Sequence, residues 1–240
     1  MKTRLLLLPA LAVAACGPAK SSPDAGVDTS CGIDCAAQAE YGLLPQACFE
    51  YTGNNLPALG VQVGPAETLE GGMAVMPVTY KQGGLTKQVD YFTVKDGALV
   101  QVRREWPAAG SVSYQDGSGN LVGVTWLSPG QGAGEVTRNT VNARWVQGST
   151  DRIDTDTKFD VSLEEATPLS LKTPKETFPS GLRLNISEVP EHASDIRRVL
   201  VRGTGFIRFS SPLDPAGSGT AGEYELQSIK TLPEGSFDCG

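Results

Sequence analysis

The residues best placed to do covalent chemistry in this sequence are four cysteines, Cys31, Cys35, Cys48 and Cys239. An even number of cysteines is typical of two disulfide bonds in a chain that leaves the cytoplasm, and the first residues described below predict export. A structural zinc site would need cysteine pairs spaced as C-x-x-C or several histidines, and the sequence has neither. We therefore expect disulfides rather than a metal.

Three pairings of these cysteines are possible. The letters "CGID" lead into a helix that Asp34 is expected to cap, and an extended entry would hold the Cα atoms of Cys31 and Cys35 beyond the roughly 7 Å that a disulfide tolerates. Both other pairings bond Cys239 to the N-terminal cluster, and of these we favour Cys35–Cys48 with Cys31–Cys239. Either would staple the last strand to the first ordered segment and contribute about 4 to 5 kcal/mol.

Paired carboxylates are the second group that could do chemistry. Glu164-Glu165 and Glu223/Glu225 could supply the two acids of a glycosidase. That mechanism requires carboxyl groups about 5 to 10 Å apart, and a spacing along the chain does not give this separation. Acidic residues are also common on the outward face of strands. We expect no catalytic residue, and a carboxylate-based hydrolase of envelope polysaccharide stays an alternative.

Four aspartates gather in "STDRIDTDTKFD", residues 149–160: Asp151, Asp154, Asp156 and Asp160. Oxygen ligands at this spacing can wrap Ca²⁺ in a loop. The stretch does not fit an EF-hand, because Lys158 takes a ligand position counted from Asp154 and no glycine supplies the sharp turn. An irregular calcium site and a solvated acidic loop therefore remain the two interpretations of this stretch. We favour the loop, and predict no metal and no cofactor.

Histidine chemistry is nearly excluded, since His192 is the only histidine and no Gly-x-Ser-x-Gly motif is present. Three tryptophans and two tyrosines could instead line a sugar-binding face or a lipid cavity, although such residues in strands are more often packing residues. These are Trp106, Trp126, Trp145, Tyr91 and Tyr114.

The N-terminal segment "MKTRLLLLPALAVAA", residues 1–15, has two basic residues, an apolar run and two small residues. This order predicts a secretory signal, and the segment is too short to span a bilayer, which takes about 20 apolar residues. The next letters complete "VAAC", which resembles the lipobox of bacterial lipoproteins. The resemblance implies that Cys16 carries a diacylglyceryl thioether and an acylated amine, and covers only about the first 20 residues.

The resemblance also implies where the chain resides. Two or three acyl chains give lasting membrane attachment, whereas one gives reversible binding. In the lipoprotein sorting rule, aspartate after the lipidated cysteine retains a protein at the inner membrane, so Gly17 favours the outer membrane. Residues 16–30 hold one sizeable aliphatic and no aromatic, so we expect a flexible tether of roughly 20 Å reach.

Charge narrows the possible partners. The whole chain has a net charge of −7, and removal of residues 1–15, with Lys2 and Arg4, leaves 18 bases against 27 acids, or −9. Such a body is repelled by nucleic acid. The largest basic clusters are Arg103-Arg104 and Arg197-Arg198, and each is expected on a solvated strand or loop face. We predict attachment to the membrane at Cys16, no nucleic-acid partner and a possible envelope protein partner.

The elements that would position these residues are mostly strands. A period of two dominates after about residue 60, and Asp96-Gly97 between two alternating runs predicts a hairpin over residues 87–105. A second hairpin is predicted over 111–127, turning at 116–120. Residues 128–134, "SPGQGAG", are expected to be a long loop. Further strands are predicted at 73–80, 137–147, 158–163, 182–187, 199–209 and 223–229.

Residues 34–42 carry the only clear helix signal, with Asp34 as the cap and Gly42 as the closing residue. Residues 31–240 therefore predict one mainly β domain, an antiparallel β-sandwich or barrel with a short disulfide-bonded N-terminal helical cap. We expect a membrane-anchored exported lipoprotein whose β-domain has a binding or structural role in the cell envelope. A lipid or lipoprotein carrier of half-barrel type is the further alternative.

Overall fold

The computed structural model describes residues 33–189, 196–210, 222–233, 236 and 239. Its elements in the described part of the chain are α1 (Cys35–Glu40), β1 (Ala47–Gly53), β2 (Leu56–Val63), β3 (Glu67–Thr68), a 3₁₀ turn (Glu70–Gly72), β4 (Ala74–Gln82), β5 (Leu85–Lys95), β6 (Ala98–Trp106), β7 (Gly110–Gln115), β8 (Val124–Leu127), β9 (Val136–Gln147), β10 (Thr150–Glu165), β11 (Leu182–Val189), β12 (Ile196–Val201), β13 (Gly205–Ser210) and β14 (Glu223–Thr231).

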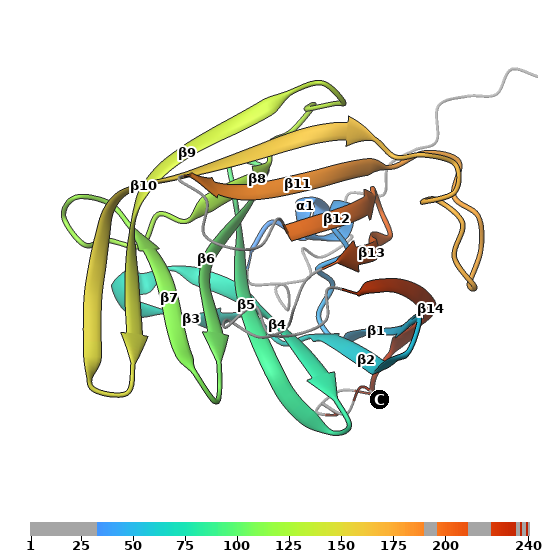
Figure 1. The fold of residues 1–240 in the computed structure, drawn as a ribbon, viewed down its shortest axis with the longest axis horizontal. Coiled ribbons are helices and arrows are strands. Elements are labelled where there is room, and N and C mark those ends of the chain that lie inside the picture. Colours follow the sequence, from blue (N-terminus) through green and yellow to red (C-terminus); the bar gives the residue numbers. More distant parts are fainter. Residues whose placement is uncertain (1–32, 190–195, 211–221, 234–235, 237–238, 240) are drawn as a thin grey trace, which may run out of the picture.

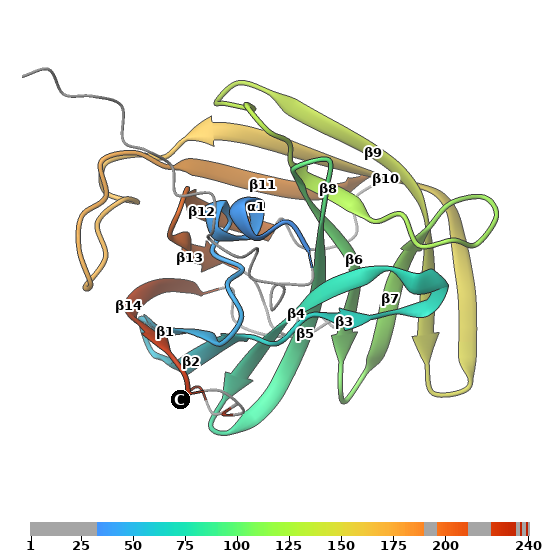
Figure 2. The same ribbon diagram turned by 180° about the vertical axis from the view of Figure 1, so that it is seen from behind.

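The strands close into an antiparallel barrel (Figures 1 and 2). Twelve of the described strands follow one another around the ring in the order β2-β1-β14-β13-β12-β11-β10-β9-β7-β6-β5-β4, and β4 pairs with β2 to complete it. β3 extends β4, and β8 pairs with β6. The structure thus has the barrel of the two predicted architectures, and closure leaves few free sheet edges.

The core fills the inside of this barrel because successive residues of a strand point to opposite faces. On β11, Leu184 and Ile186 are buried inside, while Asn185 between them faces outward. The predicted hairpin at Asp96-Gly97 is confirmed, since both residues have the positive φ that this tight turn requires. The loop predicted at 128–134 is also present, between β8 and β9.

The predicted hairpin over residues 111–127 is wrong. The turn itself forms, and Asp116 accepts hydrogen bonds from the backbone N–H groups of Ser118 and Asn120. β8 then leaves β7 and pairs with β6. The redirection occurs at Gly123, which has a positive φ and lies so close to Val100 that a Cβ there would come within 2.5 Å of it.

Two further strand predictions need correction. The single strand predicted at 199–209 is two strands, β12 and β13, joined by a tight turn at 202–204. The hairpin of β1 and β2 was not predicted, because its turn at Asn54 and Asn55 lacks the usual glycine.

The predicted disulfide-bonded helical cap is not formed. α1 has six residues, with Asp34 accepting from the backbone N–H of Ala37 as expected, but it is too short to cover the barrel. It lies against the β5–β6 turn, where the Tyr41 hydroxyl donates to the carbonyl of Gly97.

The described disulfide joins Cys48, in β1, to Cys239, so both favoured pairings are wrong. The favoured pairs depended on an extended entry into the helix at residues 31–34, whereas Cys48 lies on β1, which pairs with β14 near the C-terminal segment. The expectation that Cys239 staples the C-terminal segment to the N-terminal region is confirmed. The bond belongs to the one connectivity that the sequence argument set aside, the one that leaves Cys31 and Cys35 for each other. Cys31 lies outside the described residues, so a bond between these two is not tested.

Candidate binding site

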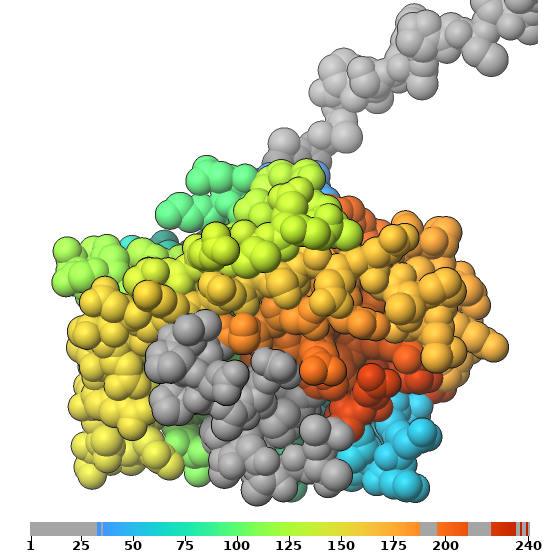
Figure 3. Space-filling model, turned by 45° about the horizontal axis from the view of Figure 1, so that its top comes forward, coloured from blue at the N-terminus to red at the C-terminus, as the bar shows by residue number. Residues whose placement is uncertain are grey.

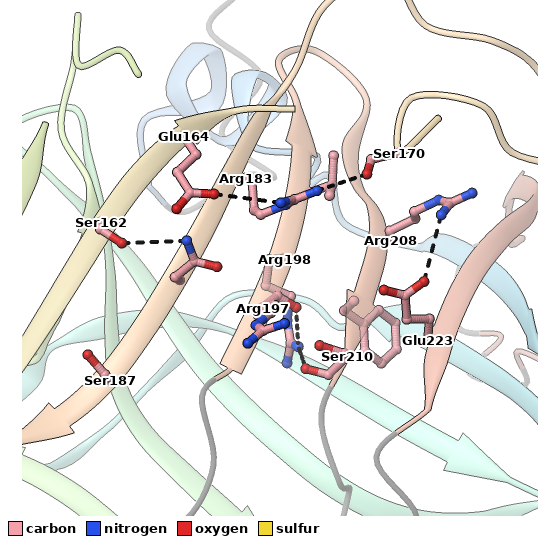
Figure 4. Close-up of a pocket in the computed structure, with 13 residues that line it drawn as sticks. Ser162, Glu164, Ser170, Arg183, Ser187, Arg197, Arg198, Arg208, Ser210 and Glu223 are labelled. Carbon is pink, nitrogen blue, oxygen red and sulfur yellow. Dashed lines mark hydrogen bonds and ion pairs between the residues drawn. The ribbon is translucent and has the colours of Figure 1, made fainter. Parts of the chain in front are cut away.

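A hollow of about 570 Å³ lies on the face of the barrel formed by β10 to β14 (Figure 4). In Figure 3 this face is turned partly toward the viewer, with the segment 166–181 at its edge. The basic residues that line the hollow are Arg183, Arg197, Arg198 and Arg208. Its neutral polar residues are Ser162, Ser170, Asn185, Ser187 and Ser210.

Most of these side chains reach the hollow because the outward positions of neighbouring strands are in register. Arg183 pairs with Val199 and Asn185 with Arg197 across β11 and β12. Among the described residues, four arginines and two glutamates, Glu164 and Glu223, line the hollow, which gives this part of the lining a formal charge of +2. The whole chain is at −7, so positive charge is concentrated here against the sign of the rest of the molecule.

Arg183 and Arg208 both form ion pairs with carboxylates of the described residues. Arg183 lies 3.6 Å from Glu164 and donates a 3.0 Å hydrogen bond to the hydroxyl of Ser170. Arg208 lies 2.7 Å from Glu225 and 3.8 Å from Glu223, and it also donates to the backbone carbonyl of Lys172. These contacts fix both guanidinium groups at the rim.

Arg198 differs from them because it is only 1 % exposed and points to the inside of the sheet. Its Nη1 donates to the carbonyl oxygens of Arg197 and Ser210, and its guanidinium lies 4.8 Å from the ring centre of Phe209. Its Nη2 is buried and has no hydrogen-bond partner in the described part of the chain. Burial lowers the pKa of Arg198, because desolvation penalises the charged form.

A second buried arginine lies across the barrel interior. Arg104 forms a two-pronged pair with Asp90, with Nε–Oδ1 and Nη2–Oδ2 distances of 2.6 and 3.2 Å. The side-chain amides of Gln88 and Gln101 also donate to this carboxylate. Burial acts to lower the pKa of Arg104, but the charge and hydrogen bonds of Asp90, with smaller effects of Tyr114 and Tyr80, raise it above the ordinary value. Tyr80 lies between the two regions and interacts with both Asp90 and Arg198.

The solvated positions expected for both arginine pairs are therefore wrong for Arg104 and Arg198, which are buried. Neighbouring strand residues point to opposite faces, so one arginine of each pair must point inward once the other points outward. The alternation of inward and outward positions along each strand predicts one inward arginine in each pair. The sequence interpretation missed it because it assumed that charged side chains stay outside the barrel.

The barrel interior beside Arg198 is nearly filled. Its described cavity has a volume of about 20 Å³ and is lined mainly by aromatic and aliphatic side chains, Tyr51 and Tyr80 among them. A single water molecule occupies about this much space. Of the aromatic residues considered for a sugar-binding face or lipid cavity, four pack on other rings: Trp126 on Phe92, Tyr114 on Phe159, and Trp106 on Trp145. The fifth, Tyr91, donates a hydrogen bond to Glu105.

The fold brings one member of each glutamate pair considered for catalysis into the lining of the hollow. Glu164 and Glu223, which come from different pairs, line the same hollow, and each faces an arginine. Glu165 is exposed and does not line it, since it follows Glu164 on the same strand. Glu225 lies against Arg208.

The four aspartates considered for calcium do not form a site. They lie along strand β10 rather than in a loop, with Asp151 paired to Arg144 and Asp154 to Arg152. No group of three or more metal-ligating residues occurs among the residues that the structure describes. His192 and Cys16 lie outside the described residues, so the lipid anchor stays a prediction.

No family model, curated protein or solved structure matches this chain. None of the helices in the described ranges has the length and apolar character of a membrane span. The site must therefore be interpreted from its own residues.

Proposed function

We propose that this chain is an exported, lipid-anchored envelope protein whose barrel binds a ligand in the hollow on β10 to β14. One observation carries the binding role: about 570 Å³ of recessed surface lined by charged and hydroxyl-bearing side chains. Small-ligand sites typically measure about 300 to 1,000 Å³ and contain a few converging polar groups. The lipid anchor is supported by the lipobox-like "VAAC" and by the small residues before Cys16.

The binding role is tested by filling the hollow. Asn185→Trp places a large ring among the lining residues, and Thr140→Trp places the same ring on an exposed site of β9 outside it. We expect a panel of charged and neutral oligosaccharides to include a compound that raises the melting temperature of wild type and Thr140→Trp but not of Asn185→Trp. Equal shifts in all three proteins would contradict a site in the hollow.

The anchor is tested separately. Radiolabelled palmitate should enter the wild-type chain and not Cys16→Ser, and only the wild type should stay with outer-membrane vesicles after washing in plain buffer. An unmodified amino terminus on the purified native chain would contradict the anchor. An envelope protein partner and the outer-membrane location rest on the same expectation.

A carboxylate-based hydrolase is the second candidate, because Glu164 and Glu223 both line the hollow. It is less well supported, since each of these glutamates forms an ion pair with an arginine, Glu164 with Arg183 and Glu223 with Arg208. Release of reducing ends from envelope polysaccharide by the wild type, lost in Glu164→Gln or Glu223→Gln, would favour it. Lipid carriage gains no support from an interior cavity of about 20 Å³.

A further inference from the structure

The hollow on β10 to β14 presents one polar side chain from each of its five strands in a single row. The row runs through Ser162, Asn185, Arg197, Ser210 and Glu223, each directly opposite the next across a strand pair. All five residues line the hollow, and Figure 4 shows the labelled ones on successive strands. Adjacent strands lie about 4.8 Å apart, so the row is about 19 Å long. The hollow is therefore an elongated site that crosses the strands.

A second row of outward residues lies beside the first and is made mostly of ion pairs. It runs from Glu164 through Arg183, Val199 and Arg208 to Glu225. The ion pairs lie at its two ends, Glu164 with Arg183 and Arg208 with Glu225. A guanidinium group has more N–H donors, and a carboxylate more lone pairs, than one ion pair uses. The paired groups can therefore still form hydrogen bonds with hydroxyl groups of a ligand.

The outward charges of the two rows cancel among the described residues. The lining has a formal charge of +2, but Arg198 is buried on the inner face, and Glu225 adds a carboxylate beside Arg208. Taking away one positive charge and adding one negative charge leaves three arginines against three glutamates. An acidic ligand would meet as many carboxylates as guanidinium groups, and like charges side by side are costly. The surface therefore favours a neutral ligand.

The polar groups of the first row match the hydroxyl groups of a sugar. The hydroxyl groups of Ser162 and Ser210 and the amide of Asn185 each donate and accept hydrogen bonds, as sugar hydroxyl groups do. A hexose in an extended chain is about as long as the distance between two adjacent strands, so successive sugar units would meet successive strands. A volume of about 570 Å³ gives room for several such units.

We propose, building on the binding role above, that the hollow takes a neutral, linear oligosaccharide that lies along the row from Ser162 to Glu223, across the strands. Its hydroxyl groups exchange hydrogen bonds with the side chains of successive strands, and the ion pairs of the second row stay intact. The length of the sugar chain, rather than its charge, then decides the affinity.

The test uses the full chain carrying Cys16→Ser, so that a lipid anchor cannot contribute. Maltotriose, cellotriose and triacetylchitotriose are the neutral probes, glucose and N-acetylglucosamine the matching single sugars, and trigalacturonate the acidic probe. We expect at least one neutral trisaccharide to raise the melting temperature. In calorimetry it should bind about tenfold or more tighter than its single sugar, since further units gain further hydrogen bonds. Its affinity should be the same at low and high salt, because no ion pair with the ligand forms.

Truncated side chains test the direction of the ligand. Asn185→Ala and Ser210→Ala, on the two strands that flank β12, should each weaken binding of the trisaccharide by about five- to tenfold. Ser187→Ala removes the same hydroxyl group from a residue that lines the hollow but lies off the row, and should change the affinity little. Thr140→Ala, on an exposed site of β9, is the control outside the hollow. None of these side chains is buried, so all four variants should melt close to the parent chain without ligand.

Binding of trigalacturonate as tight as that of the neutral trisaccharides, or an affinity that falls steeply with salt, would overturn a neutral ligand. Equal losses in Ser187→Ala and Ser210→Ala would overturn its direction along the row. Either result would leave the binding role intact if Asn185→Trp abolished the binding. The absence of any shift of the wild type across the whole panel would remove both proposals.

Discussion

Two arginines in this barrel, Arg104 and Arg198, are both buried but differ in the groups that surround them. Arg104 donates two hydrogen bonds to the carboxylate of Asp90, which also accepts hydrogen bonds from the side-chain amides of Gln88 and Gln101. Arg198 has backbone carbonyls and an aromatic ring, and one of its nitrogens has no partner among the described residues. The difference indicates that the charge of Arg104 is balanced inside the barrel, whereas Arg198 is held mainly by neutral groups of the described residues.

The largest loss of stability is expected when the buried ion pair of Arg104 and Asp90 is broken. Asp90→Asn leaves Arg104 buried without its carboxylate, and loss of one partner of a buried pair costs about 3 to 5 kcal/mol. Urea unfolding should show this loss in the free energy of unfolding. Asp151→Asn, in an exposed pair with Arg144, is the control and should change it little. Similar values for both variants would mean that the interior pair is no more important than a surface pair.

The second-largest loss of stability is expected when the disulfide is removed. β1 and β2 lie between β14, beside the hollow, and β4, beside the strand of Asp90, and Cys48–Cys239 fastens the C-terminal segment to β1. The double variant Cys48→Ser/Cys239→Ser should lose about 2 to 5 kcal/mol in the free energy of unfolding. Combined with Asp90→Asn it should lose the sum, because the two sites are separate. A combined loss much smaller than the sum would show that the disulfide and the Asp90–Arg104 pair stabilise the same part of the barrel.

Tyr80 links the two arginines, and alkaline pH tests that link. Burial raises the pKa of Tyr51 and Tyr80, so the folded chain keeps phenolic protons that the unfolded chain loses above about pH 10. Stability is therefore complete below pH 10 and falls above it, by about 1.4 kcal/mol per pH unit for each group. Their absorbance near 295 nm should rise only as circular dichroism is lost, and Tyr80→Phe should flatten the decline. Ionisation before unfolding would contradict their burial.

The smallest effect is expected at Glu50, on the surface of β1. Lys230 and Ser228 lower the pKa of its carboxyl group by hydrogen bonding. Its stabilising contribution is thus present above the ordinary pKa of glutamate and is lost as pH falls. Because the pair is largely exposed, Glu50→Gln should cost about 0.2 to 1 kcal/mol at neutral pH, measured by urea unfolding, and less in high salt. A loss as large as that of Asp90→Asn would remove the distinction between interior and surface pairs.

Much of the fold could be predicted from local patterns. The hairpin at Asp96-Gly97 and the strands β4, β5 and β6 follow from alternation and turn chemistry, which act over a few residues. The pairing of β8 with β6 and the bond between Cys48 and Cys239 could not be predicted, because they join segments that no local pattern relates. The hollow was missed for the same reason, since its residues come from five strands and from the segment between β10 and β11.

The sequence by itself determined that most of the chain forms antiparallel strands, that four cysteines are available for bonding, and that the N-terminal residues resemble an export signal with a lipidation site. Tertiary structure alone decided that the sheet closes, and with it which arginine of each adjacent pair faces inward. Alternation places neighbours on opposite faces but does not say which face becomes the interior. Only the curvature of the closed sheet makes that choice, and it places Asp90 beside Arg104 and no described carboxylate in an ion pair with Arg198.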